Sequence, residues 1–307
     1  MTIALYAHKP HAILPFLRQD LPDTVVAVGS IMCNRTSEDE AGPVEGLPVP
    51  GVLSTIHATF PPAQNGEALQ PGESWVIAYA LPRPSEQIRV YHSLQHYPAR
   101  QTPETIARAG AEINAVIDEM AKLYPAQRVV GQVPEVFRPF VQAHVGGPDH
   151  GRNWTYFAPP GGTKVDLSGV NTDGLELGLA REEDAALIFA ENKYRSLEYY
   201  ASRAAHTTVL RPTVAPGEPT PLPVAWFMTH GDGSVGALHT MPAYRRRGLA
   251  KVLIAKHLGD LEARGVPVYC NVENGNEVSA KLWEGLGWTR GWNATWIYQY
   301  QHGARKW

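Results

Sequence analysis

The sequence has 307 residues, of which 44% are hydrophobic and 19% are charged, and its formal net charge is −3. This length exceeds the usual size of one domain, and the composition is that of a soluble globular protein rather than a fibrous or disordered one. The acidic balance argues against a broad binding surface for nucleic acid or for an anionic membrane, because phosphate binding relies on a local excess of Lys and Arg. We therefore expect two domains and small-molecule partners.

Cysteine usage and the N-terminal segment bear on the compartment. Cys33 and Cys270 are the only cysteines, too few for a disulfide framework, so a reducing compartment is expected. The N-terminus resembles neither a secretory signal nor a transit peptide, and no stretch approaches the apolar length of a membrane span. We expect a cytoplasmic protein, with mitochondria as the alternative that the family resemblance below implies. No metal site is expected, because the scattered histidines lack a ligand set.

In the first half of the chain, three segments predict strands because they are rich in β-branched and apolar residues. They are TVVAVGSIMCN (24–34), ESWVIAYALP (73–82) and QIRVYHS (87–93). The segment 103–125 predicts a helix, because Ile106, Ile113, Ile117 and Met120 fall on one helical face between two prolines. This half is α/β and carries no motif with recognisable chemistry.

Two turn-rich stretches divide the rest of the sequence. Dense Gly and Pro at 145–169 interrupt any helical or strand pattern and predict a domain boundary. We accordingly expect an N-terminal domain at 1–150, a linker at 151–174 and a second domain at 175–307. A second Pro-rich stretch, 211–223, predicts a loop inside the second domain.

The second half has a clearer pattern of elements. Asp232 sits in a Gly-Asp-Gly turn between two apolar runs, which is typical of a β-hairpin. In chain order the patterns predict one or two helices at 181–205, strands at 206–211, 223–230 and 234–241, a helix at 249–265, a strand at 267–273, a helix at 276–287 and a strand at 293–301.

The loop between the strand at 234–241 and the next helix carries the pattern Arg245-x-x-Gly248-x-Ala250. A helix N-terminus presents free backbone N–H groups and a partial positive charge, and a glycine there lets a phosphate approach closely. Arg246 or Arg247 supplies a full positive charge. The loop therefore predicts a binding site for a small anionic ligand.

This segment is similar to motif A of the GCN5-related N-acetyltransferase (GNAT) superfamily, in which an R/Q-x-x-G-x-G/A loop binds the pyrophosphate of acyl-coenzyme A. A second segment, ENGNEVSAKLWEGLGW (273–288), resembles motif B of the same superfamily, N-x-x-S/A-x-x-L-Y-x-x-x-G-F. The positions that match motif B are Asn276, Ser279, Leu282, Trp283, Gly287 and Trp288. The sequence looks most like the glycine N-acyltransferase-like branch.

The resemblance implies the fold and the activity. It implies a GNAT fold with a mixed central sheet flanked by helices, and a catalytic C-terminal domain preceded by a degenerate copy of that fold, although no internal sequence repeat is visible. It further implies an acyl-CoA-dependent N-acyltransferase that moves an acetyl or larger group to a small amine such as an amino acid, by direct attack in a ternary complex. The alternatives are an acyl-CoA-binding protein with weak or no turnover and a protein or peptide N-acetyltransferase.

The resemblance also implies a set of co-substrate contacts. The strand end would pair with the pantetheine arm, the loop would bind the phosphates, and Arg245 would brace the loop. Asn276 would cap its helix and contact pantetheine, and Trp283 would pack beside it. The full set of expected acyl-CoA contacts is Leu238, Thr240, Met241, Arg246, Arg247, Gly248, Leu249, Ala250, Asn276 and Trp283.

The catalytic groups are less clearly defined. His239 can titrate near neutral pH and is a candidate base, with a packed structural histidine as the alternative. Glu273 is a second candidate base that would act through a water. Trp283 stands where the family often has Tyr, and an indole N–H does not supply a proton. Ser279 is the substitute donor to the departing thiolate, with a helix-interior serine that donates back to a backbone carbonyl as the favoured alternative. We expect Cys270 to be a buried structural thiol rather than a nucleophile.

Overall fold

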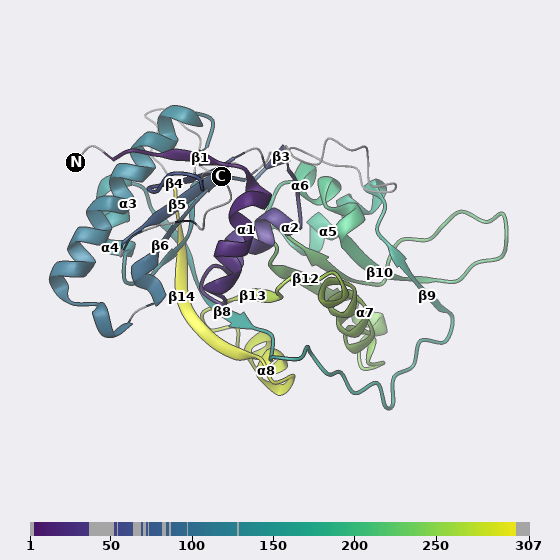
Figure 1. The fold of residues 1–307 in the computed structure, drawn as a ribbon. Coiled ribbons are helices and arrows are strands. Elements are labelled where there is room, and N and C mark those ends of the chain that lie inside the picture. The colour runs from purple at the N-terminus through teal and green to yellow at the C-terminus, as the bar shows by residue number, and fades with distance from the viewer. Residues whose placement is uncertain are drawn as a thin grey trace.

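The computed structural model describes residues 3–36, 52–53, 55–63, 69, 72, 74–81, 84–85, 87–96, 98–127 and 129–298. Within these residues, twelve strands form one continuous sheet, with helices on its faces (Figure 1). Its order is β1-β4-β5-β6-β7-β14-β8-β13-β12-β11-β10-β9, and two short strands, β2 (Arg35–Thr36) and β3 (Val52–Leu53), pair separately. None of the helices in this part of the chain combines the length and apolarity needed to cross a membrane.

The main elements of each half follow one order, β-α-α-β-β-β-α-β-α-β. The first half consists of β1 (Tyr6–His8), α1 (Pro10–Gln19), α2 (Val25–Met32), β4 (Ile56–Ala58), β5 (Val76–Ala80), β6 (Gln87–His92), α3 (Pro103–Leu123), β7 (Val129–Pro134), α4 (Arg138–Val145) and β8 (Asp149–Phe157). The second half consists of β9 (Leu175–Leu179), α5 (Ala185–Glu191), α6 (Leu197–Ser202), β10 (Thr207–Pro212), β11 (Ala225–Thr229), β12 (Val235–Thr240), α7 (Leu249–Ala263), β13 (Tyr269–Glu273), α8 (Glu277–Gly285) and β14 (Thr289–Tyr298).

Each half gives its last strand to the other half. Strand β8 pairs with β13 of the second half, and β14 pairs with β7 of the first half, so β14 and β8 meet at the centre of the sheet. In both halves, one pair of strands is parallel, β6 with β7 and β12 with β13. The expectation of a mixed sheet flanked by helices, with an N-terminal copy of the C-terminal fold, is confirmed.

Most of the expected helices and strands are present, and one predicted strand is wrong. Residues 24–34, expected as a strand, contain helix α2, whose Val25, Ala27, Val28 and Ile31 are all buried. A short continuous apolar run has no period that separates a buried helix from a buried strand, which explains the error. The segment expected as a linker also begins inside β8, whose Thr155 and Tyr156 are buried. The domain boundaries themselves stay a prediction.

The sheet of the second half separates two packed layers, which fixes where the site lies. Phe227 of β11 packs with α7 and with Trp283 of α8 on one face. Its neighbours Trp226 and Met228 point to the opposite face and pack with residues of α5 and α6. Alternation along a strand therefore decides which helix layer each side chain of β11 and β12 meets.

Candidate anion-binding loop and sheet opening

The parallel strands β12 and β13 pair at only one position, Val235 with Cys270. On the other side of β12, two residues, Ala237 and Leu238, lie opposite the single residue Phe227, which is a β-bulge. Ala237 has a φ of 51°, a rare value for a residue with a side chain. Beyond Val235, no described strand pairs with β12 on its β13 side, so backbone groups at the end of β12 are available to a ligand.

The chain leaves β12 through a short 3-10 turn (Pro242–Tyr244) and enters α7 at Gly248, its N-cap, which has a φ of 78° and adds no side-chain cap. The five backbone N–H groups from Arg246 to Ala250 donate no hydrogen bond to a described residue. A helix start of this kind attracts anions, because its N–H groups and helix dipole act together. The loop therefore has the geometry that the sequence pattern predicts.

The corresponding position of the first half is closed. Helix α3 follows β6 as α7 follows β12, but it begins with Thr102 and Thr105 in a reciprocal capping box and with Pro103 in its first turn. Thr102 Oγ1 accepts a hydrogen bond from the Thr105 N–H at 3.3 Å. Capping side chains and a proline leave fewer free N–H groups for an anion. Of the two helix starts, only that of α7 has N–H groups without a capping side chain.

The three arginines of the loop differ in what they contact. Arg245 donates from Nε to the Thr240 carbonyl at 3.0 Å. Arg247 donates to the Asn171 carbonyl and Oδ1, both at 3.2 Å, and to the Asp173 carbonyl at 2.8 Å. Arg246 is exposed, and its side chain has no hydrogen bond or ion pair to a described residue. Arg245 therefore braces the loop as expected, Arg247 braces it as well, and Arg246 alone presents a free charge.

The segment 166–173 borders this loop, which gives Gly248 a second requirement. A Cβ at Gly248 would lie 2.8 Å from Val170 Cγ2, closer than real side chains come. The Asn171 N–H also donates to the Arg247 carbonyl at 2.9 Å. Glycine is therefore needed for its positive φ and for this close approach. The local pattern gave no signal for the contact, because Val170 lies far away in sequence.

His239 lies on the α5 and α6 side of β12. Its ring stacks on Trp226 with 4.7 Å between centroids, and its Nε2 lies 3.6 Å from Oε2 of Glu191 at the end of α5. Nε2 makes no hydrogen bond within the described structure. Burial lowers the pKa of His239, and the Glu191 carboxylate partly opposes this. His239 is therefore mostly neutral near pH 7, with a carboxylate beside it that the sequence analysis did not identify.

The remaining predicted residues lie around the start of α8. Asn276 Oδ1 accepts the Ser279 N–H at 3.1 Å, so the predicted N-cap is confirmed. Ser279 is half-buried and Glu273 is exposed at the end of β13. Trp283 is only 3% exposed and packs against Phe227 and Trp288. The co-substrate contacts of Asn276 and Trp283, and the catalytic roles of Ser279 and Glu273, stay predictions.

The two cysteines are structural. Cys33 and Cys270 are both buried and free, as expected for Cys270. Burial raises the pKa of the Cys33 thiol to about 11 and raises that of Cys270 strongly. Neither thiol is therefore a nucleophile near neutral pH.

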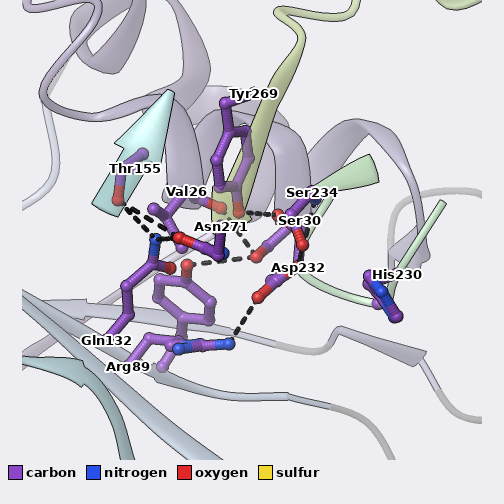
Figure 2. A network of polar contacts seen from close by, with 12 residues as sticks. Val26, Ser30, Arg89, Gln132, Thr155, His230, Asp232, Ser234, Tyr269 and Asn271 are labelled. Carbon is purple, nitrogen blue, oxygen red and sulfur yellow. Dashed lines mark hydrogen bonds and ion pairs between the residues drawn. The ribbon is translucent and has the colours of Figure 1, made fainter. Parts of the chain in front are cut away.

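The hairpin between β11 and β12 joins the two halves. Asp232 accepts hydrogen bonds from the N–H and Oγ of Ser234, which confirms its role in the turn. It also forms a buried ion pair with Arg89 of β6 at 2.5 Å (Figure 2). The pair joins residues 143 positions apart, and nothing in the local pattern of either segment predicts it.

The second half of the central sheet thus has an opening beside a helix start with free N–H groups, in an α/β fold. Residues 220–297, which contain both features, match the family model described as FR47-like protein. None of the curated proteins compared with the sequence matches it.

Three solved structures illustrate what the chain is similar to. An X-ray structure of a Drosophila protein from a structural genomics consortium has a TM-score of 0.64 and 14% identity, over 96% of this chain and 98% of that chain. A tandem GNAT protein from the clavulanic acid biosynthesis pathway has a TM-score of 0.43 and 11% identity, over 97% and 99%. A GCN5-related N-acetyltransferase from Kribbella flavida has a TM-score of 0.45 and 15% identity, over 74% and 87%. The Drosophila match shows that this two-half fold occurs in another protein.

Proposed function

We propose that this protein is an acyl-CoA-dependent N-acyltransferase whose second half binds acyl-coenzyme A and carries out the transfer. One observation carries the proposal: the unpaired end of β12 leads through a short loop into an open helix start, so a strand-pairing surface and an anion site follow each other. Acyl-coenzyme A has the matching parts in sequence, a pantetheine arm with amides and a diphosphate. The FR47-like match over the same residues supports this proposal.

The proposed binding uses backbone and charge together. The amides of pantetheine pair with backbone groups at the end of β12, in the manner of an added strand. The contacts proposed there are Leu238, Thr240 and Met241, where the Thr240 carbonyl already accepts from Arg245 and the Met241 N–H already donates to Val224. The diphosphate accepts hydrogen bonds from the N–H groups of Gly248, Leu249 and Ala250 and lies near the Arg246 guanidinium. We assign Arg247 mainly to bracing, because its hydrogen bonds go to Asn171 and Asp173.

The proposed chemistry starts from a neutral His239. The His239 ring takes a proton from the ammonium of the acceptor, and the Glu191 carboxylate, 3.6 Å from Nε2, stabilises the imidazolium that forms. The free amine attacks the thioester carbonyl, the new C–N bond forms and the C–S bond breaks. The nitrogen then loses its second proton, which replaces the proton that Ser279 gives to the departing thiolate. Ser279 is the proposed donor to the departing thiolate, because the buried indole N–H of Trp283 is not acidic near neutral pH.

We propose a small amine or amino acid as acceptor, in line with the resemblance to the glycine N-acyltransferase-like branch, and a cytoplasmic location. A second candidate function, binding of acyl-coenzyme A without efficient turnover, is favoured by Trp283 at a position where the family often has Tyr. The two functions differ in whether thiol is released, and they share the binding site.

Calorimetric titration with acetyl-coenzyme A tests the binding site itself. We expect saturable binding to the wild-type chain. In Arg246→Glu we expect binding to be weaker by about 10-fold or more, because the variant loses one charge-assisted contact and adds charge repulsion. Lys256→Glu is the control, since it reverses an exposed charge on helix α7. Lys256 pairs with Asp260 and lies away from the loop. Equal affinity in all three proteins would contradict the site.

A further inference from the structure

The two end strands of the twelve-stranded sheet differ in how well they are protected from pairing with another chain. Strand β1 has three residues and is followed by Lys9 and Pro10, and short edges with a charge and a proline discourage such pairing. Strand β9 at the other end has five residues, Leu-Glu-Leu-Gly-Leu, and pairs with β10 without a bulge. It contains no Lys, Arg or Pro, and no described strand covers its outer edge (Figure 1). The outer edge of β9 is therefore open to strand pairing.

The side chains of β9 are apolar on one face and small or acidic on the other. Leu175 packs on the core that holds α7, and alternation places Leu177 and Leu179 on the same face. Leu177 is 39% exposed and Leu179 is 55% exposed. The opposite face carries Glu176 and Gly178. A Cβ at Gly178 would meet no described atom within 4 Å, and its φ is not positive, so nothing within the single chain requires glycine there.

The backbone groups of the three leucines point away from β10. At the ends of the β9–β10 ladder, Ala180 donates to the Thr207 carbonyl at 2.8 Å, and the Gly174 carbonyl accepts from Thr213 at 2.9 Å. In an antiparallel ladder, alternate residues direct their N–H and C=O groups to opposite sides of the strand. Even-numbered residues of β9 therefore bond to β10, and the odd-numbered leucines present their backbone groups at the open edge.

Only some of these outward groups already have a partner. The Leu175 N–H donates to the Thr172 carbonyl at 2.9 Å, and the Leu179 carbonyl accepts from Arg211 Nη2 at 3.3 Å. Three kinds of group have no partner among the described residues: the N–H and the carbonyl of Leu177, the N–H of Leu179 and the carbonyl of Leu175. A strand that pairs with this edge has to match that pattern.

We propose that β9 pairs in antiparallel fashion with β9 of a second copy of this chain, about a twofold axis at Leu177, and so forms a homodimer with one continuous sheet. Leu177 of each copy then donates to the Leu177 carbonyl of the other copy. Each Leu179 N–H donates to the Leu175 carbonyl of the other copy. This register uses only the backbone groups that have no partner in the single chain, and it leaves the existing hydrogen bonds in place.

The side chains fit the same register. On the α7 face, each leucine lies opposite a leucine of the other copy, which removes exposed apolar surface from water. On the other face, Glu176 of each copy lies opposite Gly178 of the other, so no two carboxylates face each other directly. The sequence Leu-Glu-Leu-Gly-Leu is thus complementary to itself, which favours a second copy over an unrelated strand as the partner.

Sedimentation of the full chain at concentrations from about 1 µM to about 500 µM tests the dimer, because an interface built around one short strand is small and its affinity is weak. We expect a reversible monomer–dimer equilibrium. Leu177→Pro removes the N–H at the twofold axis but none that bonds to β10, and Leu177→Lys places two positive charges at the axis. Each is expected to weaken dimerisation by about 10-fold or more.

The matched control is Leu123→Lys, which replaces an exposed leucine at the end of α3 in the first half and is expected to leave dimerisation unchanged. A monomer at every concentration would overturn the proposal. A dimer that forms equally well in Leu177→Lys and in the control would also overturn it, whether or not Leu177→Pro folds.

Disulfide crosslinking between two variants, Glu176→Cys and Gly178→Cys, tests the register. In the proposed pairing, position 176 of one copy faces position 178 of the other with about 4.5 Å between Cα atoms, whereas identical positions lie diagonally, about 7 Å apart. Only the first distance suits a disulfide. The native Cys33 and Cys270 are buried and do not compete.

We expect an oxidised mixture of the two cysteine variants to give at least about 3-fold more crosslinked dimer than either variant alone. Crosslinking that is no greater in the mixture than in the separate variants would contradict the twofold axis at Leu177.

Discussion

Arg245, Arg246 and Arg247 are adjacent in sequence but have different surroundings. The first and third donate hydrogen bonds to backbone carbonyls that hold the loop, whereas Arg246 is exposed and held at a φ of 62°. Positive φ in a residue with a side chain costs free energy, and such strain tends to occur at binding sites. The loop thus directs one arginine outward beside five N–H groups that donate to no described residue.

Arg246→Glu is expected to raise the KM for acetyl-coenzyme A by about 10-fold or more, with the melting temperature little changed, because the side chain packs against nothing described. Arg247→Ala is expected to lower the melting temperature, because its hydrogen bonds to Asn171 and Asp173 are lost. Steady-state kinetics and thermal unfolding of both variants separate the two effects. A larger loss of stability in Arg246→Glu than in Arg247→Ala would contradict these roles.

His239 makes a prediction about pH. Because burial lowers its pKa below 6.5, the neutral base persists into mildly acidic solution, and kcat/KM is expected to fall only as the pH drops through that lowered pKa. Glu191→Gln removes the charge that raises the pKa, so the acid limb is expected to move to still lower pH. His239→Asn is expected to reduce kcat by about 10²-fold or more.

The control for the pH profile is Glu198→Gln, which removes an exposed carboxylate on the neighbouring helix α6. A profile that does not change in Glu191→Gln, or that moves equally in the control, would show that Glu191 does not act on His239.

At the scale of elements, His257 connects two strands to helix α7. Its ring lies between Thr208 of β10 and Thr229 of β11, with 2.7 Å to each hydroxyl oxygen. Burial lowers its pKa to about 4. Between pH 6.5 and about 4, the unfolded chain therefore binds a proton that the folded chain excludes, and the free energy of unfolding falls as the pH falls.

A histidine of this kind changes the free energy of unfolding by up to about 1.4 kcal/mol per pH unit in this window. His257→Gln is expected to weaken the pH dependence of stability between pH 6.5 and 4, since Gln keeps polar atoms but does not titrate. Denaturant unfolding at a series of pH values measures this. An unchanged slope would mean that His257 is protonated in the folded protein.

The start of α8 gives a second prediction at this scale. Asn276→Ala removes the side chain that accepts the Ser279 N–H and is expected to cost about 1 kcal/mol of stability, while Asn276→Asp retains the cap. Ser279→Ala leaves the N–H and the cap in place. This variant is expected to preserve stability and to lower kcat if the hydroxyl gives a proton to the thiolate. Chemical denaturation and kinetics on the same variants therefore distinguish the capping role of Asn276 from the proton-donor role of Ser279.

At the scale of the whole molecule, the exchange of β8 and β14 makes each half depend on the other. Strand β14 lies between β7 and β8, so a break between the halves removes a strand from both and leaves unpaired edges. We expect fragments 1–157 and 158–307 to be unfolded or aggregated alone and to form a one-to-one complex when produced together. A fragment 158–307 that unfolds cooperatively as a monomer would contradict this.

The parts of the structure that sequence reasoning predicted are those whose determinants are contiguous. The helix start at Gly248, the hairpin at Asp232 and the cap at Asn276 each depend on residues within a few positions. The strand expected at residues 24–34 is wrong, because a short apolar run fits helix and strand alike. The contacts of Glu191 with His239, and of Arg89 with Asp232, join segments that are distant in sequence. Taken alone, each of these residues has the pattern of an ordinary surface or strand residue, so the contacts could not be predicted. The strand exchange could not be predicted either, since the alternation of apolar and polar residues along β8 and β14 is the same whichever half they join.

The central claim is that the second half transfers an acyl group from coenzyme A to a small amine. Its most direct test is thiol release from acetyl-coenzyme A in the presence of glycine, other amino acids, simple amines and peptides, with His239→Asn measured beside the wild-type chain. We predict release that depends on one or more of the small amines and is strongly reduced in the variant. Saturable binding of acetyl-coenzyme A without release for any acceptor would leave a binding protein, and neither binding nor release would contradict the account as a whole.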